Sequence, residues 1–230
     1  MTEFTKWRSL VDGAEISAIP DSQVYLQDDW GDNKLTDRDD SGTTTYNGVE
    51  GVYRPEWKID DGSPEADDNQ LQYSSGDALH AEIELNLDET VTWEFENVDG
   101  SASGGESSGQ YVISLMADTT DHFAGDETEI GYSEGYELFM RDDDAGDLFR
   151  FRRNDDAGSD NETLISADNP TDGRDIKVTR EPDGTWQLFL DGDSVGGTEV
   201  DDTYTDPIIT GYVARGNRNV IVSVDEMKVF

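Results

Sequence analysis

The chain of 230 residues contains no cysteine, only five lysines and two histidines, and no long apolar run. The absence of cysteine excludes a disulfide framework, a thiolate metal site and a cysteine nucleophile. No stretch approaches the roughly 18–20 apolar residues of a membrane-spanning helix, and the first ten residues contain no apolar segment that could begin a secretion signal. We therefore expect a protein that is made and kept in the cytoplasm until lysis and does not insert into a membrane.

Carboxylates are present in large excess, with 54 Asp and Glu against 16 Lys and Arg, for a formal net charge of −38. Self-repulsion on this scale destabilises a compact state in dilute salt. Molar salt removes the repulsion, because the Debye length falls to roughly 3 Å at 1 M. Asp outnumbers Glu by 35 to 19 and Arg outnumbers Lys by 11 to 5. This composition predicts adaptation to concentrated brine, and it disfavours nucleic acid as a partner, since phosphate binding needs a basic patch.

Residues 1–22 differ in pattern from the rest of the chain. Phe4, Trp7, Leu10 and Val11 are spaced as on one face of a helix, and Asp12-Gly13 follows as a stop signal. The segment is too short to fold alone, so it needs a surface to bury the stripe. We expect residues 1–22 to be a helical or extended N-terminal segment for anchoring or oligomerisation. The alternative, that the stripe packs on its own domain, stays open.

Residues 23–230 have the period of two that is typical of half-buried strands. Ala81, Ile83, Leu85 and Leu87 alternate with polar residues, and turn sequences such as Pro182-Asp-Gly184 separate similar runs. Five Trp, nine Tyr and eight Phe argue against a disordered acidic chain. About a dozen short strands indicate an all-β antiparallel sandwich. We expect the stretches 32–50, 60–70 and 99–109 to leave the sheets.

Several segments resemble concanavalin A-like, laminin-G-like jelly-roll domains. The resemblance rests on Asp28-Asp29-Trp30-Gly31-Asp32, Trp57-Lys-Ile-Asp-Asp-Gly62, Gly184-Thr-Trp-Gln-Leu-Phe-Leu-Asp-Gly192 and Val222-Ser-Val-Asp-Glu-Met-Lys-Val229. It covers roughly residues 24–230 and implies a jelly-roll β-sandwich. That superfamily includes lectins, carbohydrate-binding modules, adhesion domains and some glycosidases. Together with the brine composition, the chain is similar to surface or virion proteins of haloarchaea and their tailed viruses.

The resemblance also implies candidate site residues. In relatives, aspartates of the first and last strands can hold one structural calcium ion, and the matching residues here are Asp29 and Asp225, with Asp28 beside them. Exposed aromatic rings would stack on sugars, and the candidates are Trp30, Tyr46 and Tyr53, each of which can equally be a core residue. Trp57 is the aromatic residue that we favour for the core.

The function expected from these features is attachment. We expect a halophilic virion or cell-surface structural protein, located on the virion or extracellular surface. Its expected partners are further copies of itself in a homo-oligomer, other virion or surface proteins, and a host-surface glycan. A purely architectural component without a ligand is the alternative. A glycoside hydrolase is a minor one: Glu82/Glu84 and Glu94/Glu96 each lie about 7 Å apart on one strand face. The Glu-x-Asp-x-x-Glu strand of laminarinase-type relatives is missing, so we expect no enzyme.

Overall fold

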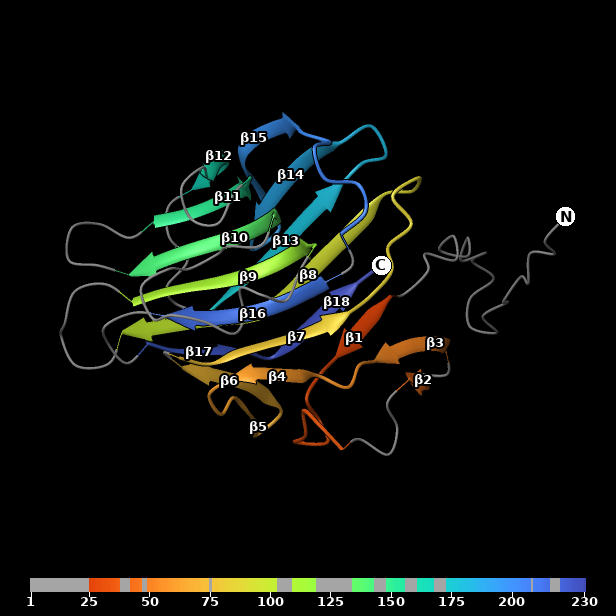
Figure 1. Cartoon of the computed structure of the whole chain (residues 1–230), viewed down its shortest axis with the longest axis vertical. Helices are drawn as coiled ribbons and strands as arrows, with labels where there is room; N and C mark the ends of the chain where they lie inside the picture. Colours follow the sequence, from red (N-terminus) through yellow and green to blue (C-terminus); the bar gives the residue numbers. More distant parts are fainter. Residues whose placement is uncertain are drawn as a thin grey trace, which may run out of the picture.

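The computed structural model describes residues 25–37, 42–46, 49–74, 76–102, 109–118, 134–142, 148–155, 161–167, 173–207, 209–215 and 220–230. Every regular element in these ranges is a β-strand, and all strands except the hairpin strands β2 and β3 belong to two antiparallel sheets stacked face to face (Figure 1). The predicted all-β jelly-roll sandwich is therefore confirmed. The described residues include no helix long and apolar enough to span a bilayer. The expected segment 1–22 lies outside the described residues.

One sheet has seven strands. In order across the sheet they are β12 (Asn161–Ala167), β11 (Leu148–Asn154), β10 (Gly135–Asp142), β9 (Gly109–Ala117), β16 (Ile209–Arg215), β7 (Ala78–Glu82) and β4 (Lys58–Asp61). One face of this sheet packs on the core, and the other is called here the outer face. The strand order places β7 beside β16, although they are more than 120 residues apart in the chain.

The second sheet has nine strands and is built around one long strand. Its order is β15 (Asp193–Val200), β14 (Thr185–Leu190), β13 (Arg174–Arg180), β8 (Val91–Ala102), β17 (Val220–Val224), β6 (Gln70–Ser74) and β5 (Glu65–Asp67), with β18 (Glu226–Val229) pairing β8 and β1 (Leu26–Asp28). Both β17 and β18 pair with β8, because they follow one another along the same edge of β8 and only Asp225 interrupts them. The Asp225 N–H donates to the Glu96 carbonyl at 3.0 Å.

The core lies between the sheets and is rich in aromatic rings. Burial alternates with a period of two along β6, β13, β14 and β18, as predicted. Trp93 and Trp186 are fully buried and stack with ring centroids 5.7 Å apart. Trp57 lies between Trp30 and Tyr212, each 5.5 Å away, so its predicted place in the core is confirmed.

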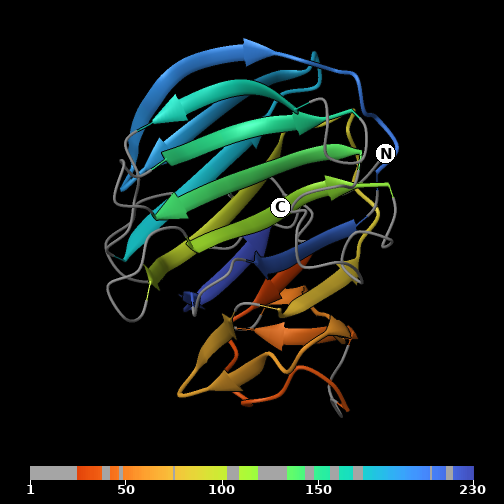
Figure 2. The ribbon, with the colours of Figure 1, turned by 60° about the vertical axis from the view of Figure 1, so that its left-hand side comes forward.

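The structure corrects several details of the predicted layout. The stretch 32–50 leaves the two large sheets, as expected, but it also forms part of an unforeseen separate hairpin of β2 (Gly42–Tyr46) and β3 (Val49–Arg54). The stretch 60–70 contains β5, and β8 continues to Ala102 through the start of the expected Gly/Ser loop. Acidic or Gly-rich composition hid these strands, because pairing with a neighbour overrides weak local propensity. Figure 2 shows β2 to β6 gathered at one end of the sandwich.

Two connections between the sheets pass one another at the same end of the sandwich. The chain leaves β7 through residues 83–90 to enter β8 of the other sheet, and it returns from β15 through residues 201–207 toward β16. The last cross-strand pair between β7 and β16 is Glu82 with Ile209. Beyond that pair the two strands separate, which opens a space between the crossing segments.

Candidate functional site

Asp28 is the most deeply buried of the predicted metal ligands. It ends β1 opposite Met227 of β18, and its side chain is fully buried. One carboxylate oxygen, Oδ1, accepts the Trp30 backbone N–H at 3.0 Å, and the other, Oδ2, accepts the Trp57 Nε1–H at 2.8 Å. The carboxylate thus fixes both tryptophans, which is a structural role.

Asp29 and Asp225 also accept hydrogen bonds from N–H donors. Asp29 Oδ1 accepts the Gly31 N–H at 3.1 Å, whereas Asp225 accepts the side-chain amides of Gln70 and Asn97, the latter at 2.9 Å. Calcium needs several oxygen atoms converging on one point. No group of three or more His, Asp or Glu side chains suited to a metal ion occurs among the described residues. The carboxylates as they lie form no calcium cage, and calcium at Asp28, Asp29 and Asp225 stays a prediction.

The predicted sugar-stacking aromatics lie at the same end of the chain. Trp30 is fully buried against Trp57, so its ring is not available to a ligand, and of the two roles left open for it the structure shows the core role. The cause is the Asp28 hydrogen bond, which turns the Trp30 backbone inward at φ 53°. Tyr46 is the last residue of β2, and Tyr53 is the residue before the last of β3. The side chains of both lie outside the described part of the structure.

The outer face of the seven-stranded sheet carries a buried polar row. Glu137 pairs laterally with Arg152 and Ser114, and Gly211 pairs with Ser114 and His80. The residues Ser114, Glu137, Arg152 and His80 are each at most 7% exposed. Burial raises the pKa of Glu137, although the ion pair with Arg152 opposes that shift. This row offers little accessible surface to a large ligand.

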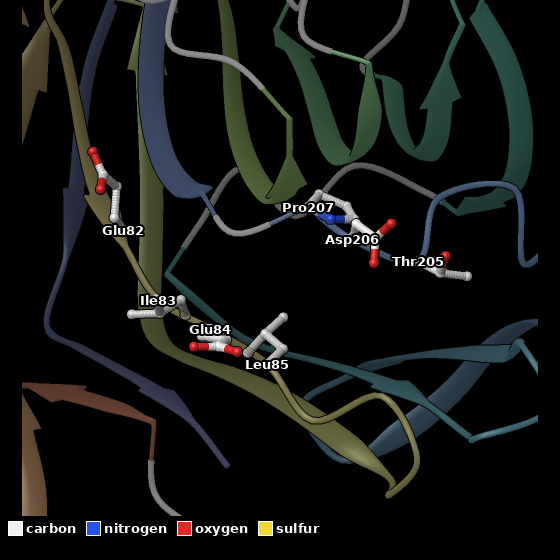
Figure 3. Close-up of a pocket in the computed structure, with 7 residues that line it drawn as sticks. All are labelled: Glu82, Ile83, Glu84, Leu85, Thr205, Asp206 and Pro207. Carbon is white, nitrogen blue, oxygen red and sulfur yellow. The ribbon is translucent and has the colours of Figure 1, made fainter.

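An accessible pocket of about 480 Å³ lies where β7 and β16 separate. Its walls are the two segments that cross between the sheets. Figure 3 shows Glu84 and Leu85 on one side and Thr205, Asp206 and Pro207 on the facing side. Pockets for small molecules commonly have volumes of roughly 300–1,000 Å³. The size therefore suits a small organic ligand or one end of a longer one.

The lining of the pocket combines hydrogen-bond acceptors with apolar carbon. Glu82, Glu84 and Asp206 contribute carboxylates and Thr205 a hydroxyl, while Ile83, Leu85 and Pro207 contribute apolar groups. Glu84, Thr205 and Asp206 are exposed, whereas Ile83 and Pro207 are buried. Such a surface can accept hydrogen bonds from hydroxyl groups and contact C–H groups at the same time.

Glu82 links the pocket to a charged cluster on β4 and β7. Its carboxylate pairs with the Lys58 ammonium, and its Oε1 lies 4.0 Å from His80 Nε2. His80 Nδ1 contacts Asp60 Oδ2 at 2.5 Å. The hydrogen bond from Lys58, together with its positive charge, lowers the pKa of Glu82. His80 itself is only 3% exposed.

The pocket was only half visible in the sequence. Glu82 and Glu84 were singled out as a carboxylate pair on one strand, and both line it. Nothing pointed to Thr205, Asp206 and Pro207, which lie more than 120 residues further along the chain. The available signal was the topology: β7 and β16 are antiparallel neighbours, so the segment that leaves β7 and the segment that enters β16 lie at the same end of the sandwich. That inference needs the strand order, which periodicity does not give.

No protein-family model and no characterised protein matches the sequence. Solved structures do match in fold. The Emp47p carbohydrate recognition domain superposes with a TM-score of 0.59 at 13% identity, over 77% of this chain and 89% of that one. A legume lectin-like domain from Entamoeba histolytica gives 0.54 at 12% identity, over 76% and 89%. The CBM2 module of the evolved Dit of Lactobacillus casei BL23 phage J-1 gives 0.55 at 13%, over 90% and 94%. The chain therefore has the lectin-like jelly-roll fold.

Proposed function

We propose that the chain is a carbohydrate-binding domain and that the pocket between residues 82–85 and 205–207 holds the glycan. The observation that carries the proposal is the pocket itself, in which carboxylate and hydroxyl groups face apolar carbon across an accessible opening. Saccharides present the same two features, a ring of hydroxyl donors and a patch of C–H groups. The names of the fold neighbours, a carbohydrate recognition domain and a carbohydrate-binding module, support this assignment.

The biological setting that we propose is attachment in concentrated salt, on a virion or cell surface. Support comes from the net charge of −38 and from the phage origin of one fold neighbour. In molar salt, simple charge attraction is screened beyond roughly 3 Å. Recognition must then rest on hydrogen bonds and apolar contact at short range, which the pocket supplies.

The electrostatics of the two predicted carboxylate pairs do not mark Glu82 or Glu96 as the protonated acid of a glycosidase. A glycosidase needs one carboxyl group that stays protonated to act as the acid, which requires a raised pKa. The pKa of Glu82 is instead lowered by Lys58. The other pair on a strand, Glu94 and Glu96, includes a carboxylate whose pKa is lowered by the hydrogen bond from Lys228. Both Glu82 and Glu96 are thus held ionised, as hydrogen-bond acceptors.

Glycan binding is tested with a saccharide array probed in 3 M NaCl, followed by calorimetry on the strongest hit. Asp206→Ala is expected to weaken binding about tenfold to a hundredfold, since a hydrogen bond to a charged group contributes about 1.5–3 kcal/mol. Asp202→Ala is the matched control, because Asp202 is an exposed aspartate of the same segment that does not line the pocket. Equal effects of the two substitutions, or an array without any hit, would contradict the proposal.

Residues 1–22 are proposed to join the domain to a larger assembly. Deleting them is expected to leave a folded β-sandwich with a reduced oligomer mass, because the deletion removes the stripe of Phe4, Trp7 and Leu10 that is proposed to be buried against partner subunits. Light scattering and thermal melting in 3 M NaCl report the two quantities. An unchanged oligomer mass with a lower melting temperature would show instead that the segment covers its own domain.

A further inference from the structure

The pocket wall at residues 205–207 follows directly on a segment that is tied to both sheets. Asp201 begins this segment. Its backbone N–H donates to the Gly184 carbonyl at 2.9 Å, and its own carbonyl accepts the Trp186 Nε1–H at 2.8 Å. Trp186 is a fully buried residue of β14. The backbone at Asp201 is therefore fixed to the nine-stranded sheet.

The Asp201 side chain connects the same point to the seven-stranded sheet. It is only 8% exposed. Oδ1 accepts the Tyr136 hydroxyl at 2.5 Å and the Thr203 N–H at 3.1 Å, while Oδ2 pairs with the Arg153 guanidinium. Tyr136 lies on β10 and Arg153 on β11. Asp201 thus bridges the two sheets at the root of the pocket wall, through its backbone on one side and its carboxylate on the other.

Tyr204 adds a second set of contacts immediately before the pocket. Its N–H donates to the Tyr136 hydroxyl oxygen at 3.3 Å, and its own hydroxyl donates to Asp155 Oδ1 at 3.1 Å. Arg153 holds Asp155 through two hydrogen bonds of 2.7 and 2.8 Å. The Tyr204 ring stands edge-on to that of Tyr136, with centroids 5.8 Å apart. The Tyr136 hydroxyl is therefore the shared contact, donating to Asp201 and accepting from Tyr204.

The charges of this network favour the same arrangement. Burial alone raises the pKa of Asp201, but hydrogen bonds from Tyr136 and Thr203 outweigh it, so that the pKa lies below its usual value. The hydrogen bond from Arg153 lowers the pKa of Asp155. Both carboxylates are thus ionised at neutral pH, and each one accepts from a tyrosine hydroxyl and from Arg153. Charge-assisted hydrogen bonds of this kind are about twice as strong as neutral ones.

We propose that Tyr136 and Asp201 are positioning residues for the glycan pocket, although neither lines it. Their hydrogen bonds hold residues 203–206 in place, and Thr205 and Asp206 meet the ligand only while that segment is held. The inference rests on the proposed function for its ligand. The opposite wall has its own support, because Ile83 packs in the core and the Asn86 N–H donates to the Tyr25 hydroxyl at 2.9 Å. Loss of the Tyr136 hydroxyl should therefore loosen one wall and leave the other in place.

Tyr136→Phe tests this inference, because it removes the hydroxyl and keeps the buried ring against Phe151 and Trp186. Amide hydrogen exchange and saccharide calorimetry are measured in 3 M NaCl. We expect exchange of residues 203–206 to quicken at least about tenfold and the affinity for the saccharide hit to fall by a similar factor, with exchange at residues 83–86 unchanged. Tyr73→Phe is the matched control: Tyr73 is 1% exposed, and its hydroxyl has no hydrogen-bond partner among the described residues.

The two measurements separate the outcomes. If Tyr136→Phe quickens exchange at 203–206 but the wild-type chain binds no saccharide, the hydrogen-bond network holds the segment and the proposed function fails. If exchange at 203–206 stays at the wild-type rate, or changes equally in Tyr73→Phe, the positioning role is overturned whatever the affinity does. A melting temperature lowered without local exchange would likewise overturn it, since that is the result of a merely structural role. Tyr204→Phe, which removes only the hydrogen bond to Asp155, should show the same local change to a smaller extent.

Discussion

Transfer of the protein from 3 M to 0.1 M NaCl is expected to unfold it, with loss of the β-type circular dichroism signal below roughly 0.5 M. The reason is the net charge of −38. The excess carboxylates repel one another more strongly as the Debye length grows from roughly 3 Å at 1 M to 10 Å at 0.1 M. Unfolding moves the carboxylates apart and so lowers their repulsion energy. Salt screens that repulsion in the folded state, so that burial of the apolar core is sufficient to keep the chain folded.

A control distinguishes screening from the general effect of salt on apolar burial. Replacing NaCl by an uncharged, excluded osmolyte strengthens burial without screening charge. The chain in osmolyte at 0.1 M NaCl should therefore remain less stable than in 3 M NaCl. A thermal midpoint that is the same at 0.1 M and 3 M NaCl would contradict the prediction and remove brine adaptation from the account.

Asp28→Ala is expected to lower the stability of the sandwich by about 3 kcal/mol, because two buried N–H groups lose a charged acceptor. These are the Trp57 Nε1–H and the Trp30 backbone N–H. For a chain of this size the loss corresponds to a fall in melting temperature of about 6–12 °C. Asp29→Ala is the matched control, since its hydrogen bond to the Gly31 N–H is exposed and should contribute little. Equal effects of the two substitutions would contradict the structural role of Asp28.

Removal of divalent metal with EDTA tests the calcium prediction, in the wild-type chain and in variants of the predicted ligands. If calcium binds at Asp28, Asp29 and Asp225, EDTA should lower the wild-type melting temperature at constant ionic strength, since a ligand of the folded state stabilises it. Asp225→Ala should then abolish that shift. The hydrogen-bond role of Asp28 predicts a loss on Asp28→Ala that is the same with and without EDTA. A wild-type chain insensitive to EDTA removes calcium from the account.

The fold was predictable because burial alternates along several strands, among them β6, β13, β14 and β18. The closing segments that resemble jelly-roll domains depend on local sequence, and the structure follows them in β14 and β18. Burial also alternates over residues 81–87 as predicted, but the strand β7 ends at Glu82. The β2–β3 hairpin was missed because it follows an acidic stretch and was interpreted as part of it, although β2 has no acidic residue and β3 has only Glu50. Its strands pair mainly with each other rather than with either sheet.

The candidate site was less predictable, because it depends on which segments meet. The hydrogen-bond network of Tyr136, Arg153 and Asp201 joins three parts of the chain, and no spacing rule connects them. The two roles left open for Trp30, sugar stacking and core packing, were not separable from the sequence, because sequence alone does not show the hydrogen bond between the Trp30 N–H and Asp28. Polar residues reveal their role only when the acceptor of each N–H donor is known.

The most direct test of the glycan assignment is a crystal structure of the protein with the strongest saccharide from the array, grown in molar salt. The account predicts electron density for the sugar between residues 82–85 and 205–207, with hydroxyl groups within hydrogen-bond distance of the carboxylates of Glu84 and Asp206. Density for the sugar elsewhere on the domain, with this pocket filled only by water, would contradict it.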